Sequence, residues 1–200
     1  GEYAIEGDIN IVDNTVLYGE GYTSFLNFSN GGLVLDSTIA EDPTIQLHKW
    51  RIADLRLERS GATTGPVINM FGDGGTPNDG VSWGQLDTVF ITGSYNDSAV
   101  KSGEGIKCSD TYIMDWYNVV VLSCTKGAYF TDVAGIGCLD VRLHGGEFGR
   151  CTEAGIYTEN IVGLSLFGTS IEGNNTAGAV GMHIGQGGSI AGTSTSILLS

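Results

Sequence analysis

Positive charge is scarce in this sequence, and long apolar runs are missing from it. Lys and Arg together number 9 against 23 Asp and Glu, which gives a formal net charge of −14. Nucleic acids and anionic membrane surfaces bind basic faces, so we expect neither nucleic acid nor such a membrane as a partner. No apolar run approaches the roughly 18 residues of a membrane-spanning helix, so we also expect no membrane insertion.

Proline and helical periodicity are scarce as well. The chain has only 3 prolines but 32 glycines, and these glycines lack the Gly-X-Y period of collagen. Hydrophobic residues make up 41% of the chain, which argues against disorder. No stretch carries the apolar period of a long amphipathic helix. An all-β chain of short strands that turn at Gly and Asn remains, and 200 residues are enough for one domain with a continuous core.

Cysteine pairs with metal-binding spacing are absent too. The four cysteines form no C-x-x-C pair and show no spacing to His that suits zinc, so we expect no metal site of that kind. Cys108 falls at an inward position of a strand, where a thiol packs as a small hydrophobe. We therefore expect reduced cysteines rather than disulfides, and assembly of the protein in a reducing cytosol. The four residues are Cys108, Cys124, Cys138 and Cys151.

What the sequence does contain is one short phrase written four times. It starts at Gly105, Gly127, Gly155 and Gly181, and in the copies apolar positions alternate with others. A period of roughly 20 to 30 residues with short alternating strands and Gly turns indicates the stacked coils of a solenoid. We therefore predict a parallel β-helix of about seven or eight coils, forming a single domain over residues 1–200.

A second short strand follows each of the first three copies of the phrase, and we predict that these second strands also stack. They are expected at residues 118–122, 139–143 and 163–167. Residues 72–80 and 93–104 are rich in turn-forming residues and are predicted to be loops projecting from one coil, where function often lies. The pattern weakens after residue 186, so we expect the β-helix to fray or end there and the chain to be part of a longer one.

Alternate side chains of a strand point to opposite faces of the sheet, which sends one residue of each coil outward in a column. That column is predicted to contain Lys107, Tyr129, Tyr157 and His183, with Gln46 and Val67 as earlier members. Tyrosine combines an apolar ring with a polar tip, which suits sugar rings, so we consider this column a candidate glycan-binding surface. The alternative, that stacked rings only stabilise the sheet through cross-strand contacts, stays open.

Apolar residues are predicted to face outward on the second strands. They are Phe90, Val120, Leu122 and Phe167. A contiguous apolar patch of this kind is usually covered. Either the loop at residues 93–104 covers it or a second copy of the chain does, which makes the four residues a candidate subunit interface.

Acidic residues end three of the repeated strands, at Asp110, Asp132 and Glu159. Carboxylates on adjacent coils would lie about 5 Å apart, and those two coils apart about 10 Å, near the separations of retaining and inverting glycoside hydrolases. The same residues are also suited to bind calcium or to close turns by accepting hydrogen bonds from local backbone amides. Catalysis, calcium binding and turn closure all stay open.

Two stretches give the chain a family resemblance. Gly1, Tyr3 and Ile5 follow a G-x-Y-x-I pattern, and residues 16–23 read V-L-Y-G-E-G-Y-T. Together with S-I-E-G-N at residues 170–174, these residues make the chain resemble the pectate-lyase-type β-helix of bacteriophage tailspikes and polysaccharide depolymerases. The active-site motifs of polygalacturonases and of pectate lyases do not occur in it, so the resemblance concerns architecture more than activity.

This resemblance implies a right-handed, single-stranded β-helix that assembles as a homotrimer. It further implies a virion protein, assembled in the host cytoplasm and acting outside the cell, with a host-surface polysaccharide and other virion tail proteins as partners; secretion is the alternative location. Three functions are considered: glycan binding with or without cleavage, a purely structural role in the virion, and a free-standing polysaccharide lyase or glycoside hydrolase. No cofactor is expected, with calcium as the one alternative.

Overall fold

The computed structural model describes residues 1–39, 47–60, 65–72, 80–93, 103–132, 137–173, 178–185 and 197–199. In this part of the chain the regular structure consists of β-strands and two short 3-10 helices, η1 (Gly21–Thr23) and η2 (Ser37–Ile39). All the strand pairings found there are parallel. The all-β prediction is thereby confirmed, and the parallel sheets are consistent with a β-helix.

The strands belong to two sheets. The smaller one, called sheet B here, has seven strands, and the larger one, sheet A, has thirteen. In order across sheet B lie β2 (Ile9–Asn10), β5 (Leu33–Asp36), β8 (Ile68–Phe71), β10 (Ile106–Ser109), β13 (Lys126–Thr131), β16 (Ala154–Thr158) and β19 (Val180–Ile184).

Sheet A has a main path and shorter strands beside it. The main path contains β1 (Glu2–Glu6), β4 (Phe25–Asn30), β7 (Arg51–Arg59), β9 (Val81–Thr92), β11 (Thr111–Tyr117), β14 (Cys138–His144), β17 (Ile161–Phe167) and β20 (Ile197–Leu199). The shorter strands are β3 (Val16–Tyr18), β6 (Leu47–His48), β12 (Val120–Leu122), β15 (Glu147–Gly149) and β18 (Ser170–Glu172).

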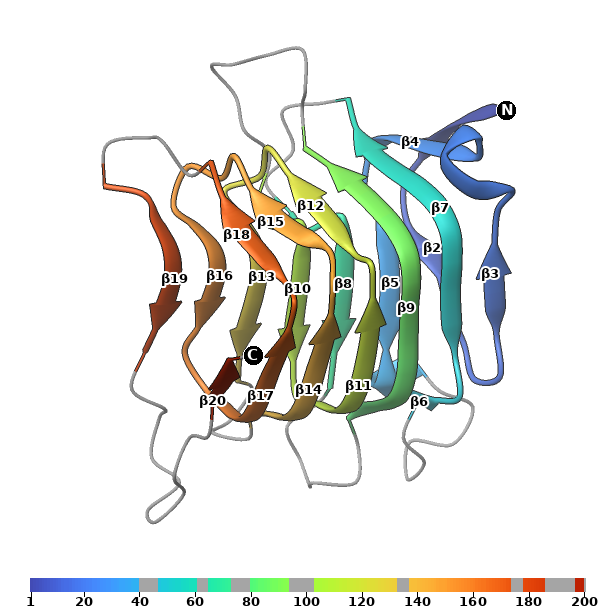
Figure 1. Ribbon diagram of the computed structural model, residues 1–200. Helices are drawn as coiled ribbons and strands as arrows, with labels where there is room; N and C mark the ends of the chain where they lie inside the picture. Colours follow the sequence, from blue (N-terminus) through green and yellow to red (C-terminus); the bar gives the residue numbers. More distant parts are fainter. Residues whose placement is uncertain are drawn as a thin grey trace.

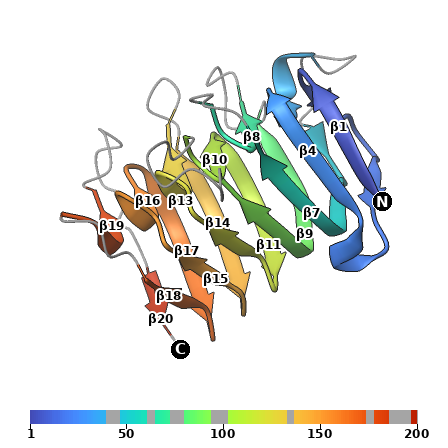
Figure 2. The same cartoon turned by 90° about the horizontal axis from the view of Figure 1, so that it is seen from above.

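The chain passes from one sheet to the other in each coil. Strand β8 of sheet B is followed by β9 of sheet A, β10 by β11, β13 by β14, and β16 by β17. Each coil therefore lays its strands beside those of the coil before it, and the colours of Figures 1 and 2 run in sequence order along the molecule. Among the described residues, no helix is long and apolar enough to cross a membrane.

Side chains from both sheets fill one core between them. The ring of Trp116 on sheet A stacks on Phe130 of sheet B, with centroids 5.6 Å apart, and on Phe148 at 6.4 Å. All four cysteines are buried, as expected of residues that pack in the core. Burial of a large apolar side chain contributes roughly 1.5–3 kcal/mol, so this shared core holds the two sheets together.

Left-handed residues bend the long strands of sheet A at the same level in successive coils. One column of such residues has φ between 51° and 79° and consists of Lys49, Trp83, Ile113, Asp140 and Gly163. The pairings of β9 with β11, β11 with β14 and β14 with β17 skip these positions and continue on both sides of them. A left-handed residue interrupts the extended chain, and the alternation of inward and outward residues shifts there by one position.

A second column of left-handed residues bends the same strands further along the chain. It consists of Asp54, Thr88, Asn118, Gly145 and Gly168. The two columns divide each coil of sheet A into segments that face different directions. A simple alternation rule applied across such a bend assigns side chains to the wrong face.

The predicted register of sheet B is confirmed. Lys107 pairs with Tyr129, Tyr129 with Tyr157, and Tyr157 with His183. These strands are short and contain no left-handed residue among the paired positions, so plain alternation holds in them.

The predicted register of the second strands is partly wrong. Residues 139–143 do stack on 163–167, as the pairing of β14 with β17 shows. Residues 118–122, however, belong to β12, which pairs with β15, whereas β14 pairs with β11. The cause is the bend at Asn118, which starts a separate segment of the coil.

Two other expectations concern earlier coils and loops. Val67 is buried and not a member of the outward column; Asn69 is the residue that pairs with Lys107. Gln46, most of the predicted loops at 72–80 and 93–104, and almost all of the chain after residue 186 lie outside the described residues.

Candidate functional site

The outer face of sheet B carries the predicted column, which we call the sheet B ladder: Lys107, Tyr129, Tyr157 and His183. The rings of Tyr157 and His183 lie nearly parallel, with centroids 4.2 Å apart and an interplanar angle of 7°. Tyr129 meets Tyr157 edge-on, with centroids 5.5 Å apart and an angle of 85°. The structure thus brings all four predicted binding residues together on one face.

A lysine that the sequence reasoning missed completes this face. Nζ of Lys126 lies 4.2 Å from the ring centroid of Tyr129 and 4.6 Å from that of Tyr157, while Nζ of Lys107 lies 5.8 Å from Tyr129. Such cation–π contacts fix the ammonium over the rings. Lys126 also forms an ion pair of 3.6 Å with Glu153. Its position directly before the repeated Gly127 was the available signal.

Glu159 is bound to the ladder through its carboxylate. It accepts a hydrogen bond of 2.6 Å from the Tyr129 hydroxyl and one of 2.7 Å from Thr131. Burial of the carboxyl opposes its ionisation, but these hydrogen bonds and the charges of Lys126 and Lys107 outweigh burial, so the pKa of Glu159 lies below its ordinary value. Glu159 is therefore a carboxylate at neutral pH and cannot act as a general acid there.

Tyr129 is perturbed in the opposite direction. Burial, together with its hydrogen bond to the Glu159 carboxylate, raises the pKa of Tyr129 to about 12. The hydroxyl therefore keeps its proton at neutral pH and holds the carboxylate in place. The pair presents an acceptor and a fixed phenol tip to the solvent side of the sheet.

The other two acids lie in the turns that follow the sheet B strands. Asp110 is 0% exposed, has a left-handed φ of 57° and accepts a hydrogen bond from the hydroxyl of Tyr112. A polysaccharide cannot reach this carboxylate, so the geometry favours turn closure for Asp110. Asp132 accepts a hydrogen bond of 3.2 Å from Asn160. Catalysis stays a prediction for Asp132 and Glu159.

The described part of the chain contains no obvious set of side chains that could bind a metal ion. No three side chains of His, Cys, Asp or Glu converge there in a way that could hold a metal ion. Calcium binding at Asp110, Asp132 or Glu159 stays a prediction.

The predicted apolar patch is divided in two. Phe90 pairs with Val120, and Leu122 lies two residues along the same strand. The ring of Tyr22 from η1 meets Phe90 edge-on at 5.0 Å, so part of the same chain already covers Phe90. Phe167 lies apart from these residues, on β17, where its ring stacks on His144 at 5.0 Å. Val120 and Leu122 stay half-buried candidates for a subunit contact.

A hollow adjoins Phe90 and Leu122. Its volume is about 340 Å³, and it is lined by Tyr22, Arg56, Phe90, Thr92, Leu122 and Arg150. The guanidinium of Arg56 lies 4.7 Å from the ring centroid of Phe25 and 5.0 Å from that of Tyr22. The lining is therefore partly cationic, and not the plain apolar surface that the sequence predicted.

Sheet A carries a second stack of rings. Tyr117 lies 4.7 Å from His144 with an interplanar angle of 12°, and His144 continues to Phe167 at an angle of 13°. An ion-pair network accompanies it, because Asp115 lies 3.4 Å from Arg142 and 3.7 Å from His144.

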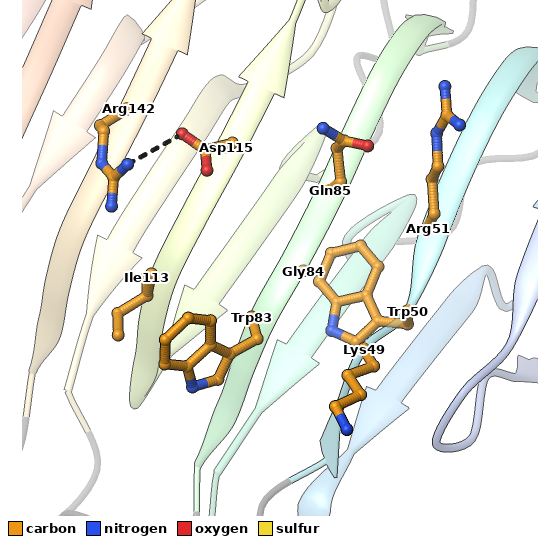
Figure 3. A pocket seen from close by; sticks show the side chains of 9 residues that line it. All are labelled: Lys49, Trp50, Arg51, Trp83, Gly84, Gln85, Ile113, Asp115 and Arg142. Carbon is orange, nitrogen blue, oxygen red and sulfur yellow. Dashed lines mark ion pairs between the residues drawn. The ribbon is translucent and has the colours of Figure 1, made fainter.

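Beside this stack lies an open groove with a volume of about 390 Å³ (Figure 3). Figure 3 shows Arg142, Asp115, Gln85 and Arg51 in a row across neighbouring strands, with Trp83 and Lys49 beside the row. The full lining is Lys49, Trp50, Arg51, Trp83, Gly84, Gln85, Ile113, Asp115 and Arg142.

Sequence reasoning missed this groove for a physical reason. Simple alternation from Val81 places Trp83 inside, but the left-handed bend at Trp83 turns the ring outward, where it is 61% exposed. The bend brings Trp83 beside Arg51 and Lys49, and the residue types at this position do not indicate that a bend occurs there.

No protein-family model, curated protein or solved structure matches this chain. The tailspike family therefore stays a resemblance in a few sequence motifs. Function has to be argued from the geometry of the faces.

Proposed function

We propose that this protein is a carbohydrate-binding β-helix of the tailspike or fibre type, which binds a host-surface polysaccharide along the sheet B ladder. The observation that carries the proposal is the Tyr129–Glu159 pair, a fixed phenol and carboxylate within a row of half-buried tyrosines and lysines that ends in an exposed histidine. Carbohydrate sites combine aromatic surface with a few well-placed hydrogen-bonding groups.

The polar groups on this face suit sugar hydroxyls. Glu159 is an acceptor, and the ammonium groups of Lys107 and Lys126 are donors. Coils repeat about 4.8 Å apart, so an extended saccharide lying across several coils would meet such a group at each step. Right-handedness, the homotrimer and the virion location belong to this proposal and are supported by the family resemblance alone.

A structural role without ligand is the competing function. The parallel rings of Tyr157 and His183 favour it, because rings that cover each other already stabilise the sheet. Both functions are compatible with the same fold, so the test has to measure binding and stability separately.

The test is glycan-array binding of the whole chain and of two variants, Tyr129→Ala and Tyr157→Ala. Each is expected to weaken binding at least about tenfold, the effect of losing one well-placed contact to a charged or aromatic group. Tyr18→Ala is the matched control, because Tyr18 is an exposed tyrosine away from the ladder. Unchanged binding by folded Tyr129→Ala and Tyr157→Ala proteins would rule out this face.

A further inference from the structure

The groove around Trp83 on sheet A has no part in the proposed function, which concerns sheet B across the core. We infer that this groove is a separate binding site for an anionic saccharide, whose ring carries a carboxylate or a sulfate. Three features of the groove carry the inference: an exposed ring, a cluster of cations and a flat floor of bare backbone.

Trp83 supplies the exposed ring. The other two tryptophans of the chain, Trp50 and Trp116, are 2% and 1% exposed, whereas Trp83 is 61% exposed. In the described part of the chain no aromatic ring stacks on Trp83. It also adopts φ of 51°, where bulky residues are disfavoured by roughly 1 kcal/mol or more. In later coils Asp140 and Gly163 occupy the equivalent left-handed position. In this coil the same position carries an indole ring that faces solvent, in a backbone conformation that is unfavourable for it.

The groove is rich in cationic side chains, although the chain as a whole is strongly acidic. Lys49, Arg51 and Arg142 line it, so three of the nine Lys and Arg residues meet in one place in a protein with a net charge of −14. Arg51 is paired with Asp87 at 2.5 Å, and Arg142 is paired with Asp140 at 2.8 Å and with Asp115, the one acid in the lining, at 3.4 Å.

Lys49 differs from the two arginines in its partners. It forms no ion pair with any residue that the structure describes, and it precedes Trp83 by one coil in the same left-handed column. An anion bound over Trp83 would therefore find one uncompensated ammonium at its side, and the guanidinium of Arg51 on the other.

The floor of the groove is flat at Gly84, which has no side chain because the indole ring of Trp50 occupies that space. A Cβ atom there would overlap the indole ring of Trp50, which packs against the bare backbone. The indole Nε1 of Trp50 is buried and has no hydrogen-bond acceptor in the described part of the chain. Buried donors without acceptors are rare, but this one lies beneath the floor, out of contact with solvent, and does not define the ligand.

The chemistry of these groups defines the ligand class. An indole face packs well against the C–H face of a sugar ring, and about 390 Å³ lies within the range of small-molecule sites. Lysine and arginine bind carboxylate and sulfate groups strongly. A nucleic acid also has rings and anions, but its dense charge is repelled by a protein of net charge −14.

Trp83 provides the readout, because it is the exposed tryptophan among three. We would titrate the whole chain with trigalacturonate, 3′-sialyllactose and a chondroitin sulfate tetrasaccharide while following tryptophan emission and acrylamide quenching. At least one of these probes is expected to shift the emission to shorter wavelength and to protect Trp83 from the quencher. Methyl-esterified trigalacturonate and lactose, the neutral counterparts, are expected to bind roughly tenfold more weakly.

Three outcomes would overturn the inference. The first is no response to any acidic probe, and the second is equal binding of an acidic probe and its neutral counterpart. The third is a response to oligothymidylate with none to the saccharides, which would make the site one for nucleic acid.

Variants locate the response and separate it from the proposed function. Trp83→Ala is expected to abolish binding, measured by calorimetry since the reporter is gone, and Lys49→Met to weaken acidic probes roughly three- to tenfold. Lys107→Met removes a cation from the other face and is expected to change nothing in this titration. Tyr157→Ala is expected to weaken array binding through the sheet B ladder at least about tenfold but to keep the groove response. The failure of one site is therefore distinguishable from the failure of the other.

Discussion

The sheet B ladder and the groove on sheet A present aromatic rings in opposite ways. On sheet B, Tyr157 and His183 lie parallel with centroids 4.2 Å apart, so each ring covers a face of its neighbour. Trp83 on sheet A stands at a bend, with most of its surface in solvent. Rings repeated in register stabilise a stack and offer edges and polar tips, whereas an isolated ring offers a face. We expect sheet B to bind through hydroxyl and charged groups and the groove to bind through stacking.

The largest expected loss of stability comes from a substitution in the floor of the groove. Gly84→Ala places a methyl group into the indole ring of Trp50, and overpacking of a core residue costs about 3 kcal/mol at the upper end of its usual range. Urea unfolding followed by circular dichroism measures the loss. Gly65→Ala is the control, because nothing lies within 4 Å of a Cβ atom at Gly65. Equal stability of the two variants would mean that the ring of Trp50 is free to move.

A smaller effect compares the stacked ring with the isolated ring. Tyr157→Ala removes contacts to two ring neighbours and a lysine, and is expected to lower the free energy of unfolding by about 1 kcal/mol. Trp83→Ala removes an exposed ring and is expected to change it by less than about 0.5 kcal/mol. The same urea experiment checks both, and a larger loss for Trp83→Ala would contradict the distinction between a stabilising ladder and a free ring.

The smallest effect concerns the pH dependence of the sheet B face. Because the folded-state pKa of Glu159 is lowered, its carboxylate contributes stability above the pKa of the unfolded chain, and that contribution disappears as the pH falls through the folded-state pKa. Glu159→Gln is therefore expected to be less stable than the parent at pH 7, by less than about 1 kcal/mol for a half-exposed group.

Unfolding curves at acid and neutral pH test this linkage. The difference between parent and Glu159→Gln is expected to shrink on acidification, and a difference that grows would contradict the lowered pKa. The raised pKa of Tyr129, about 12, has the opposite sign: its contribution is present at neutral pH and is lost as the pH rises from the ordinary tyrosine value through about 12.

Sequence reasoning succeeded where strands are short and regular. In sheet B the period of the repeated phrase placed Lys107, Tyr129, Tyr157 and His183 in their correct register, because alternation needs only an extended backbone. Glu159 was also selected, although as an acid in line with Asp132. The pairing of Phe130 with Thr158 places Glu159 beside Thr131 instead, one position before Asp132.

Sequence reasoning failed where a left-handed residue interrupts a strand. Trp83, Ile113 and Asn118 are ordinary strand or turn residues by type, yet each bends its coil and shifts the alternation. The groove and the division of the apolar patch both depend on these bends. Residue types do not encode them strongly, since packing of the whole coil imposes them.

The left-handed columns also determine how this architecture can change. Each bend is located at one residue within a coil, whatever the length of the connections between coils. Chain can therefore be inserted or removed between bends without redirecting the surfaces on either side. The position of a binding surface on such a scaffold is defined by the coil that carries it and by the side of that coil. Moving Trp83 and Lys49 together to the equivalent corners of the following coils would therefore shift the groove along the molecule in fixed steps.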